Sequence, residues 1–121
     1  MTSSHVTAVT GGRVVPVSHE PIEGGVVLIT DGVITAVGGP ETPIPDDAEV
    51  IDASGSWVLP GFVEAHGHLG VHEEGEGWSG DDTNEMTGPD GSRLRALDAI
   101  DIEEVGFKDA LRGGVTSVVI K

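Results

Sequence analysis

The sequence contains no cysteine, which excludes disulfide bonds, thiolate metal sites and a cysteine nucleophile. Basic side chains are scarce too: 6 Lys and Arg stand against 21 Asp and Glu, for a formal net charge of -15 at pH 7. Because phosphate binding needs clustered Lys and Arg, neither nucleic acid nor an anionic membrane surface is expected as a partner. The acidic residues are spread along the chain, as on a solvated surface, and they identify no substrate. Any bound metal must use His, Asp, Glu or Lys.

Long apolar runs are also missing. No stretch approaches the ~18 consecutive apolar residues of a membrane span. The N-terminal sequence MTSSHVTAVTGG has neither the basic start nor the apolar stretch of a secretory signal. We therefore expect a cytoplasmic protein that does not associate with membranes.

Up to about residue 61, short β-branched runs are separated by Gly, Pro and Asp, which is typical of an all-β region. In VVLITDGVITAVG, Asp31-Gly32 lies between two such runs. A type I′ turn needs positive φ at both central positions, and this dipeptide favours it, so we predict a β-hairpin here. The stretch GGPETPIPDDAE predicts an exposed loop. The expected strands are residues 6–9, 13–17, 25–30, 33–37, 50–53 and 57–59.

After Pro60-Gly61 the pattern changes. FVEAH predicts a short strand, and residues 70–92, rich in Gly and acidic residues, predict a long loop. The spacing of apolar residues over 99–111 predicts a helix with Asp101 as its N-cap and Gly113-Gly114 as its stop. The run VTSVVI is typical of a strand buried on both faces of a parallel sheet. Strand, loop, helix and strand together form one βαβ unit.

His66 and His68 lie at the end of the strand that FVEAH begins. Side chains at i and i+2 of a strand point to the same face, so the two imidazoles can converge on one ion. Imidazole suits Zn, Fe, Ni and related divalent metals. Two ligands do not make a site, so the pair alone is a weak signal.

The string VLPGFVEAHGHLG resembles the signature of the amidohydrolase superfamily, in which a Pro-Gly turn closes an N-terminal β-region and H-x-H ends the first barrel strand. DGVITAVG and EVIDASGSWVLPG follow the family's order, and GVTSVVI matches its second barrel strand. The subgroup resembled is that of the imidazolonepropionase-related amidohydrolases. The resemblance implies an α/β fold with a β-rich N-terminal region. Residues 1–61 would be part of a small β-sandwich domain, and 62–121 would start a (β/α)8 TIM-like barrel with strand 1, a long loop, helix 1 and strand 2.

The resemblance also implies that His66 and His68 are metal ligands, with one or two divalent ions, Zn first and Fe, Mn or Co as alternatives. The family's other ligands and its proton-accepting aspartate have no counterparts here, so no catalytic residue is expected in this chain. The implied reaction is hydrolysis of an amide, peptide or cyclic-amide C–N bond by a metal-activated water. Glu64 departs from the family, which usually has Asp there, so any support that it gives the ligands is open.

The loop after the histidines supplies further candidates for substrate contact. His72 could line the mouth of the site or be a weak third ligand, and Glu85 could bind a polar or cationic group together with the rest of DDTNE. The alternative is that His72 is an ordinary exposed histidine and that the acidic loop is simply solvated.

At 121 residues the chain is far short of the ~250 that a (β/α)8 barrel needs. We therefore expect the C-terminal remainder of the same enzyme as a partner, either because the protein is cleaved after Lys121 or because the chain is an incomplete reading of a longer gene. A homo-oligomer of the complete enzyme is also expected. The competing hypothesis is a non-catalytic binding or regulatory module derived from an amidohydrolase, retaining H-x-H by descent.

Overall fold

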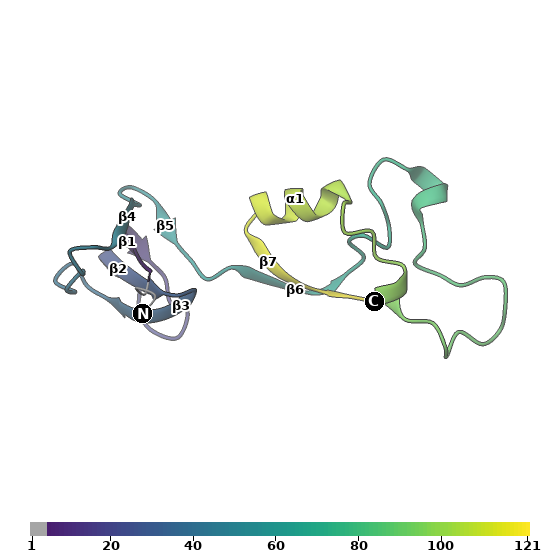
Figure 1. Ribbon diagram of the computed structural model, residues 1–121, viewed down its shortest axis with the longest axis horizontal. Helices are drawn as coiled ribbons and strands as arrows, with labels where there is room; N and C mark the ends of the chain where they lie inside the picture. The colour runs from purple at the N-terminus through teal and green to yellow at the C-terminus, as the bar shows by residue number, and fades with distance from the viewer. Residues whose placement is uncertain (1–4) are drawn as a thin grey trace. The chain divides into compact units, whose positions relative to one another are not determined.

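The computed structural model describes residues 5–121, and the chain divides into two units, Met1–Pro60 and Gly61–Lys121 (Figure 1). We call them the N-terminal and C-terminal units and describe each by itself. No helix among residues 5–121 has the length and apolar character needed to cross a membrane.

The N-terminal unit is a single five-stranded sheet with β1 as its central strand (Figure 1). β1 pairs antiparallel with β2 on one side and parallel with β4 and β5 on the other, while β3 pairs with β2. The described residues form one sheet in this unit, so the sandwich stays a prediction. The strands are β1 (Val6–Val14), β2 (Ile22–Thr30), β3 (Val33–Gly38), β4 (Glu49–Asp52) and β5 (Trp57–Val58).

The prediction of separate strands at 6–9 and 13–17 is wrong, because residues 6–14 form the single strand β1 and residues 15–17 lie outside it. The pairing of β1 with β2 shifts on either side of Gly12, and Gly11 has a φ of 79°. A bulge absorbs the extra residue without ending the strand, so the glycines bend β1 where the sequence suggested a break.

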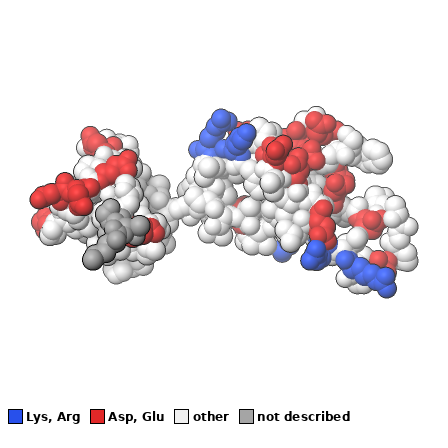
Figure 2. Space-filling model, viewed as in Figure 1, with Lys and Arg blue, Asp and Glu red and all other residues white. Residues whose placement is uncertain are grey.

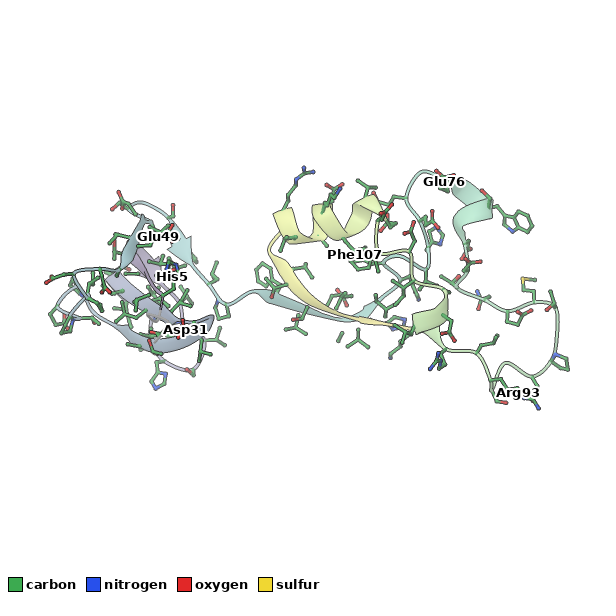
Figure 3. All side chains as sticks on the ribbon, viewed as in Figure 1. His5, Asp31, Glu49, Glu76, Arg93 and Phe107 are labelled. Carbon is green, nitrogen blue, oxygen red and sulfur yellow. The ribbon has the colours of Figure 1, made fainter. Side chains whose placement is uncertain are left out.

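The predicted Asp31-Gly32 hairpin is confirmed. The two residues have φ values of 50° and 80°, and Thr30 pairs with Val33 across the turn. Asp31 also accepts a hydrogen bond through Oδ1 from the His5 amide at 2.9 Å, and His5 Nε2 lies 3.2 Å from a carboxylate oxygen of Glu49 (Figure 3). The start of β1 is thus fastened to both the hairpin and β4.

Among residues 5–60, four apolar residues are buried: Ala8, Val14, Val26 and Val27. Val26 and Val27 are consecutive, so their side chains point to opposite faces of β2. The middle of the sheet is therefore covered on both sides by side chains of the unit itself.

The C-terminal unit pairs β6 (Phe62–Gly67) in parallel with β7 (Val115–Ile120), and α1 (Val105–Arg112) lies between them in sequence. Two short 3₁₀ helices, η1 (Gly77–Gly80) and η2 (Ala96–Asp98), interrupt the long connection before α1. The predicted order of strand, long loop, helix and parallel strand is confirmed (Figure 1).

The helix prediction is wrong at its start and right at its end. α1 begins at Val105, not near residue 99, and its N-cap is Glu104, not Asp101. The Asp101 side chain instead accepts a hydrogen bond from the Glu103 amide at 2.9 Å, which forms a local turn that competes with helix. The helix ends at Arg112 and is followed by Gly114 with a φ of 86°, as predicted for the Gly-Gly stop.

The expectation that VTSVVI is buried on both faces is also wrong for this chain. Val119 of β7 is 48% exposed, and Val63 of β6 is 70% exposed. Within residues 5–121, β7 pairs with β6 alone. A parallel strand becomes buried on both faces only inside a larger sheet covered by helices, and a two-stranded pair cannot provide that cover.

The stretch at 83–95 makes only local hydrogen bonds. Its amides and side chains bond within two or three residues, as Thr83 does with Asp81, Thr87 with Glu85 and Ser92 with Asp90. Arg93 lies in this stretch (Figure 3). It is the least constrained connection in the C-terminal unit.

Candidate metal centre

β6 brings the two predicted ligands together at its C-terminal end. The ring centroids of His66 and His68 are 5.3 Å apart with the rings inclined at 77°, and both residues are exposed. The end of the strand is held by pairing of Gly67 with Ile120 and by a 3.2 Å hydrogen bond from the Lys121 amide to the Gly67 carbonyl. The two imidazoles are therefore neighbours on a fixed backbone.

A bulge that sequence analysis did not predict lies inside the motif. Glu64 pairs with Val118 and Gly67 with Ile120, so β6 has one more residue than β7 in this interval. Within it, the His66 amide donates to Glu64 Oε1 at 2.9 Å. Bulges are frequent next to functional sites because they change the direction of a side chain. Glu64 thus contacts the main chain of His66 and not its ring, so a supporting role for Glu64 at the ligands stays a prediction.

The chain turns sharply after His68. The amides of Val71 and His72 both donate to the His68 carbonyl, at 3.0 and 2.8 Å. Gly70 makes the turn with a φ of 76°, and a Cβ there would lie 2.8 Å from the Asp101 carbonyl oxygen and 2.9 Å from Phe107 of α1. Only glycine fits this position without movement of its neighbours.

Residues 71–82 then fold into a short irregular hairpin, which we call the 71–82 hairpin. It is closed by the Asp82 amide on the Val71 carbonyl and by the Glu73 amide on the Gly80 carbonyl, each at 2.8 Å. His72 pairs with Asp81 across it, and His72 Nδ1 lies 3.4 Å from Asp81 Oδ1. The hydroxyl and amide of Thr83 lower the pKa of Asp81, and the His72 ring adds to this. His72 therefore already faces a carboxylate.

Glu85, the other candidate for substrate contact, lies elsewhere. It borders an open pocket of about 480 Å³, together with Asp82, Asn84, Arg95 and Lys121, and none of the three histidines lines this pocket. The hydroxyl and amide of Thr87 bond to the Glu85 carboxylate and lower its pKa. The structure does not bring Glu85 to the histidines.

Two imidazoles are the whole donor set at the end of β6. Within residues 5–121, no group of three His, Asp or Glu side chains is arranged to hold a metal ion. Neither the His66 nor the His68 ring makes a hydrogen bond or ion pair to another described side chain. Both rings are thus available to a ligand, and both need further donors to make a complete site.

Glu104 is the residue near this site that sequence analysis missed. It is 5% exposed, and its Oε1 accepts hydrogen bonds from the amides of Gly106 and Glu74. Glu is not among the preferred N-caps, so its residue type does not predict this role. The only available hint was its position shortly before a helical apolar pattern.

The surface around the hairpin is strongly acidic, and Figure 2 shows how few basic side chains accompany the acidic ones. Partial burial raises the pKa of Glu73, and four nearby carboxylates raise this pKa further: Asp101, Glu76, Asp82 and Glu104. The 71–82 hairpin is therefore held in place against its own charge repulsion.

Comparison with known proteins gives a consistent set of relatives, although no family model matches the sequence. A crystal structure of an amidohydrolase from Thermotoga maritima MSB8 is 38% identical and superimposes with a TM-score of 0.87, covering 94% of this chain and 29% of that one. The dihydroorotase of Mycobacterium tuberculosis is 56% identical over 43 residues, which are 36% of this chain and 10% of the relative.

A third relative is the 5-methylthioadenosine/S-adenosylhomocysteine deaminase of Halalkalibacterium halodurans. It is 42% identical over 69 residues, which are 55% of this chain and 15% of the relative. The chain thus spans less than a third of the length of each of these three proteins.

Proposed function

Because this chain belongs to the amidohydrolase superfamily and corresponds to the N-terminal part of such a protein, we propose that the complete protein hydrolyses a carbon–nitrogen bond with a divalent metal ion. His66 and His68 would be two of its ligands. The observation that carries this proposal is the pair of exposed imidazoles, 5.3 Å apart, at the C-terminal end of a parallel strand. Active sites of β/α barrels form at that end of their strands.

The residues present fit such a metal. Both rings are exposed, and neither is engaged by a described side chain, so a nitrogen of each can turn to an ion. Imidazole suits Zn and Fe, and the family resemblance adds Mn or Co as alternatives. A catalytic zinc site needs three protein ligands, so at least one donor must come from the remainder of the protein.

When bound, such an ion supplies a water of lowered pKa and polarises the carbonyl oxygen of the substrate. The residues of this chain hold and orient the two histidine ligands. The bulge and the Glu64 contact fix the main chain at His66, and the turn through Gly70 fixes the carbonyl of His68. The proton-transferring groups are expected in the remainder of the protein.

We further propose that β6 and β7 are the first two strands of a (β/α)8 barrel, preceded by part of a β-sandwich domain. The exposed apolar side chains of Val63 and Val119 support this, because further strands and helices would cover them. The remainder of the barrel would be supplied by the same polypeptide or by a second chain derived from it. A homo-oligomer and a cytoplasmic location stay as expected from the sequence.

For the substrate we propose an amide, a peptide or a cyclic amide. The relatives include a dihydroorotase and a deaminase, and both names denote action on a C–N bond. His72 would stand at the mouth of the site, since its amide bonds to the carbonyl of His68. Glu85 is a weaker candidate, because its pocket is separate from the histidines.

To test this proposal, the complete protein is purified natively and its metal content and hydrolytic activity are measured. Its intact mass identifies every polypeptide present. We expect about one or two equivalents of a divalent metal. His66→Ala and His68→Ala should each lose the metal together with hydrolysis of a panel of amides, peptides and cyclic amides. The matched control is His19→Ala, which removes an exposed histidine of the N-terminal unit.

A complete protein that stays metal-free after incubation with Zn, Fe, Mn and Co salts, and that hydrolyses nothing in the panel, contradicts the proposal. The non-catalytic binding module would then be the better explanation of the fold. Equal loss of metal in His19→Ala would show that the assay reports general damage and would also count against the assigned ligands.

A further inference from the structure

Glu104 stands out because it is the only charged residue buried among residues 5–121. Its Oε1 accepts two main-chain hydrogen bonds: one from Gly106 in the first turn of α1 at 2.8 Å, and one from Glu74 in the 71–82 hairpin at 3.1 Å. Glu74 and Glu104 are 30 residues apart in sequence. One carboxylate oxygen thus joins the hairpin to the helix.

Burying the Glu104 carboxylate does not by itself stabilise the fold. Removing its charge from water costs free energy, and its second oxygen, Oε2, has no hydrogen-bond partner. The carboxylates of the hairpin add repulsion, since Glu104 is among the groups that raise the pKa of Glu73. The start of α1 offsets part of this cost through its free amides. The burial of Glu104 is therefore better explained by the 71–82 hairpin that it binds through the Glu74 amide.

That segment leads directly to the histidines. The hairpin begins three residues after His68, and the amides of Val71 and His72 bond to the His68 carbonyl. Displacement of Glu74 would therefore displace His72, its partner Asp81 and the main chain at His68.

We propose that Glu104 is a positioning residue for the proposed hydrolase site. Through the Glu74 amide it fixes the 71–82 hairpin against α1, and the hairpin in turn sets the place of the His72–Asp81 pair at the mouth of the site. Its effect on catalysis rests on the proposed function. Its effect on the hairpin does not.

Gly106 provides an independent way to disturb Glu104. A Cβ on Gly106 would lie 2.6 Å from Glu104 Oε2 and 2.9 Å from Leu69 Cδ2, so Gly106→Ala pushes the intact carboxylate out of its position. If Glu104→Ala does not fold, Gly106→Ala still tests the role of Glu104.

The experiment uses the complete, metal-loaded protein with four variants: Glu104→Ala, Glu104→Gln, Gly106→Ala and the control Glu103→Ala, which removes an exposed glutamate next in sequence. Amide hydrogen exchange is measured along the C-terminal unit. Metal content, KM and kcat are measured with an amide substrate from the panel above.

For Glu104→Ala and Gly106→Ala, exchange in residues 71–82 should accelerate about tenfold or more, as expected from loss of hydrogen bonds to a charged acceptor, while β6 and β7 change little. KM should rise by roughly tenfold, with kcat and metal content nearly unchanged. Glu104→Gln keeps an acceptor oxygen for both amides and should restore exchange and KM. Glu103→Ala should match the wild type.

The proposal is overturned if exchange in 71–82 stays unchanged, or if it rises equally in β6 and β7, which would mean general destabilisation. It is also overturned if the hairpin loosens while KM stays constant, because Glu104 would then be structural only. A wild-type protein that binds no metal and cleaves no amide contradicts the proposed function, and exchange then decides by itself whether Glu104 fixes the hairpin.

Discussion

The two units of this chain reach order by different means. The N-terminal unit has a small apolar core, with Ala8, Val14, Val26 and Val27 buried within one sheet. In the C-terminal unit Val71 is the only buried apolar side chain among the described residues, and a carboxylate, Glu104, is buried as well. A five-stranded mixed sheet can cover residues of its central strands, whereas a two-stranded parallel pair needs further strands and helices.

The strongest test of this comparison places a charge in each unit. Val26→Asp should destabilise the N-terminal unit by roughly 4 kcal/mol or more, because it buries an unpaired carboxylate. Val63→Asp, at a position 70% exposed, should change the stability of the 121-residue chain by no more than about 0.5 kcal/mol. Urea unfolding of both variants measures the difference.

Val26→Asp and Val63→Asp also test the barrel proposal when both are made in the complete protein. There Val63→Asp should become nearly as damaging as Val26→Asp, because further strands would cover the residue. Equal damage in the 121-residue chain would show that β6 is already covered and would remove the contrast between the units.

Two glycines of similar φ should show a smaller effect, with the larger loss of stability now in the C-terminal unit. Gly32→Ala in the N-terminal hairpin has open space around its Cβ and should cost about 1 kcal/mol, the strain of positive φ alone. Gly70→Ala adds a clash with the Asp101 carbonyl and should cost roughly 2 to 4 kcal/mol. Thermal unfolding of the complete protein should rank the two; a larger loss for Gly32→Ala would contradict the tight turn after His68.

The smallest effect concerns pH and differs in sign between the units. Hydrogen bonds from Ser54 lower the pKa of Asp52, so its contribution to stability is present above its unfolded pKa and is lost as pH falls through the folded pKa. Partial burial and neighbouring carboxylates raise the pKa of Glu73, so its ionised form destabilises the fold at neutral pH, and this penalty is relieved as pH falls through the raised pKa.

Asp52→Asn should therefore lower the thermal midpoint at pH 7 slightly, and Glu73→Gln should raise it slightly. Glu73→Gln should also reduce any gain in stability of the C-terminal unit between pH 7 and mildly acid pH. Glu103→Gln is the exposed control. A lower midpoint for Glu73→Gln at pH 7 would mean that the carboxylate makes a favourable contact that outweighs the repulsion.

The elements that sequence patterns predicted well are those fixed by local chemistry. Asp31-Gly32 determines its own turn, because both residues tolerate positive φ, and Gly113-Gly114 ends its helix for the same kind of reason. His66 and His68 are neighbours, as their spacing predicts, although a bulge lies before Gly67 and His68 follows the last residue of β6.

Features that depend on contacts distant in sequence could not be predicted in this way. The bulge between Glu64 and Gly67 appears only when β6 is paired with β7. The helix begins at Val105 because Glu104 caps it while also binding the Glu74 amide, and no periodicity reports that contact. Exposure of β7 depends on which neighbours are present, a property that its apolar sequence does not contain.

The hydrogen bonds of residues 83–95 do not reach beyond a few positions, and this makes the stretch a natural place for variation in length. Doubling a flexible loop costs only about 0.6 kcal/mol in closure entropy. An epitope or fluorescent label inserted near Arg93 should therefore leave the histidines undisturbed, whereas the same insertion in residues 71–82 would separate His72 from Asp81. We therefore expect insertions to be tolerated in residues 83–95 and not in residues 71–82.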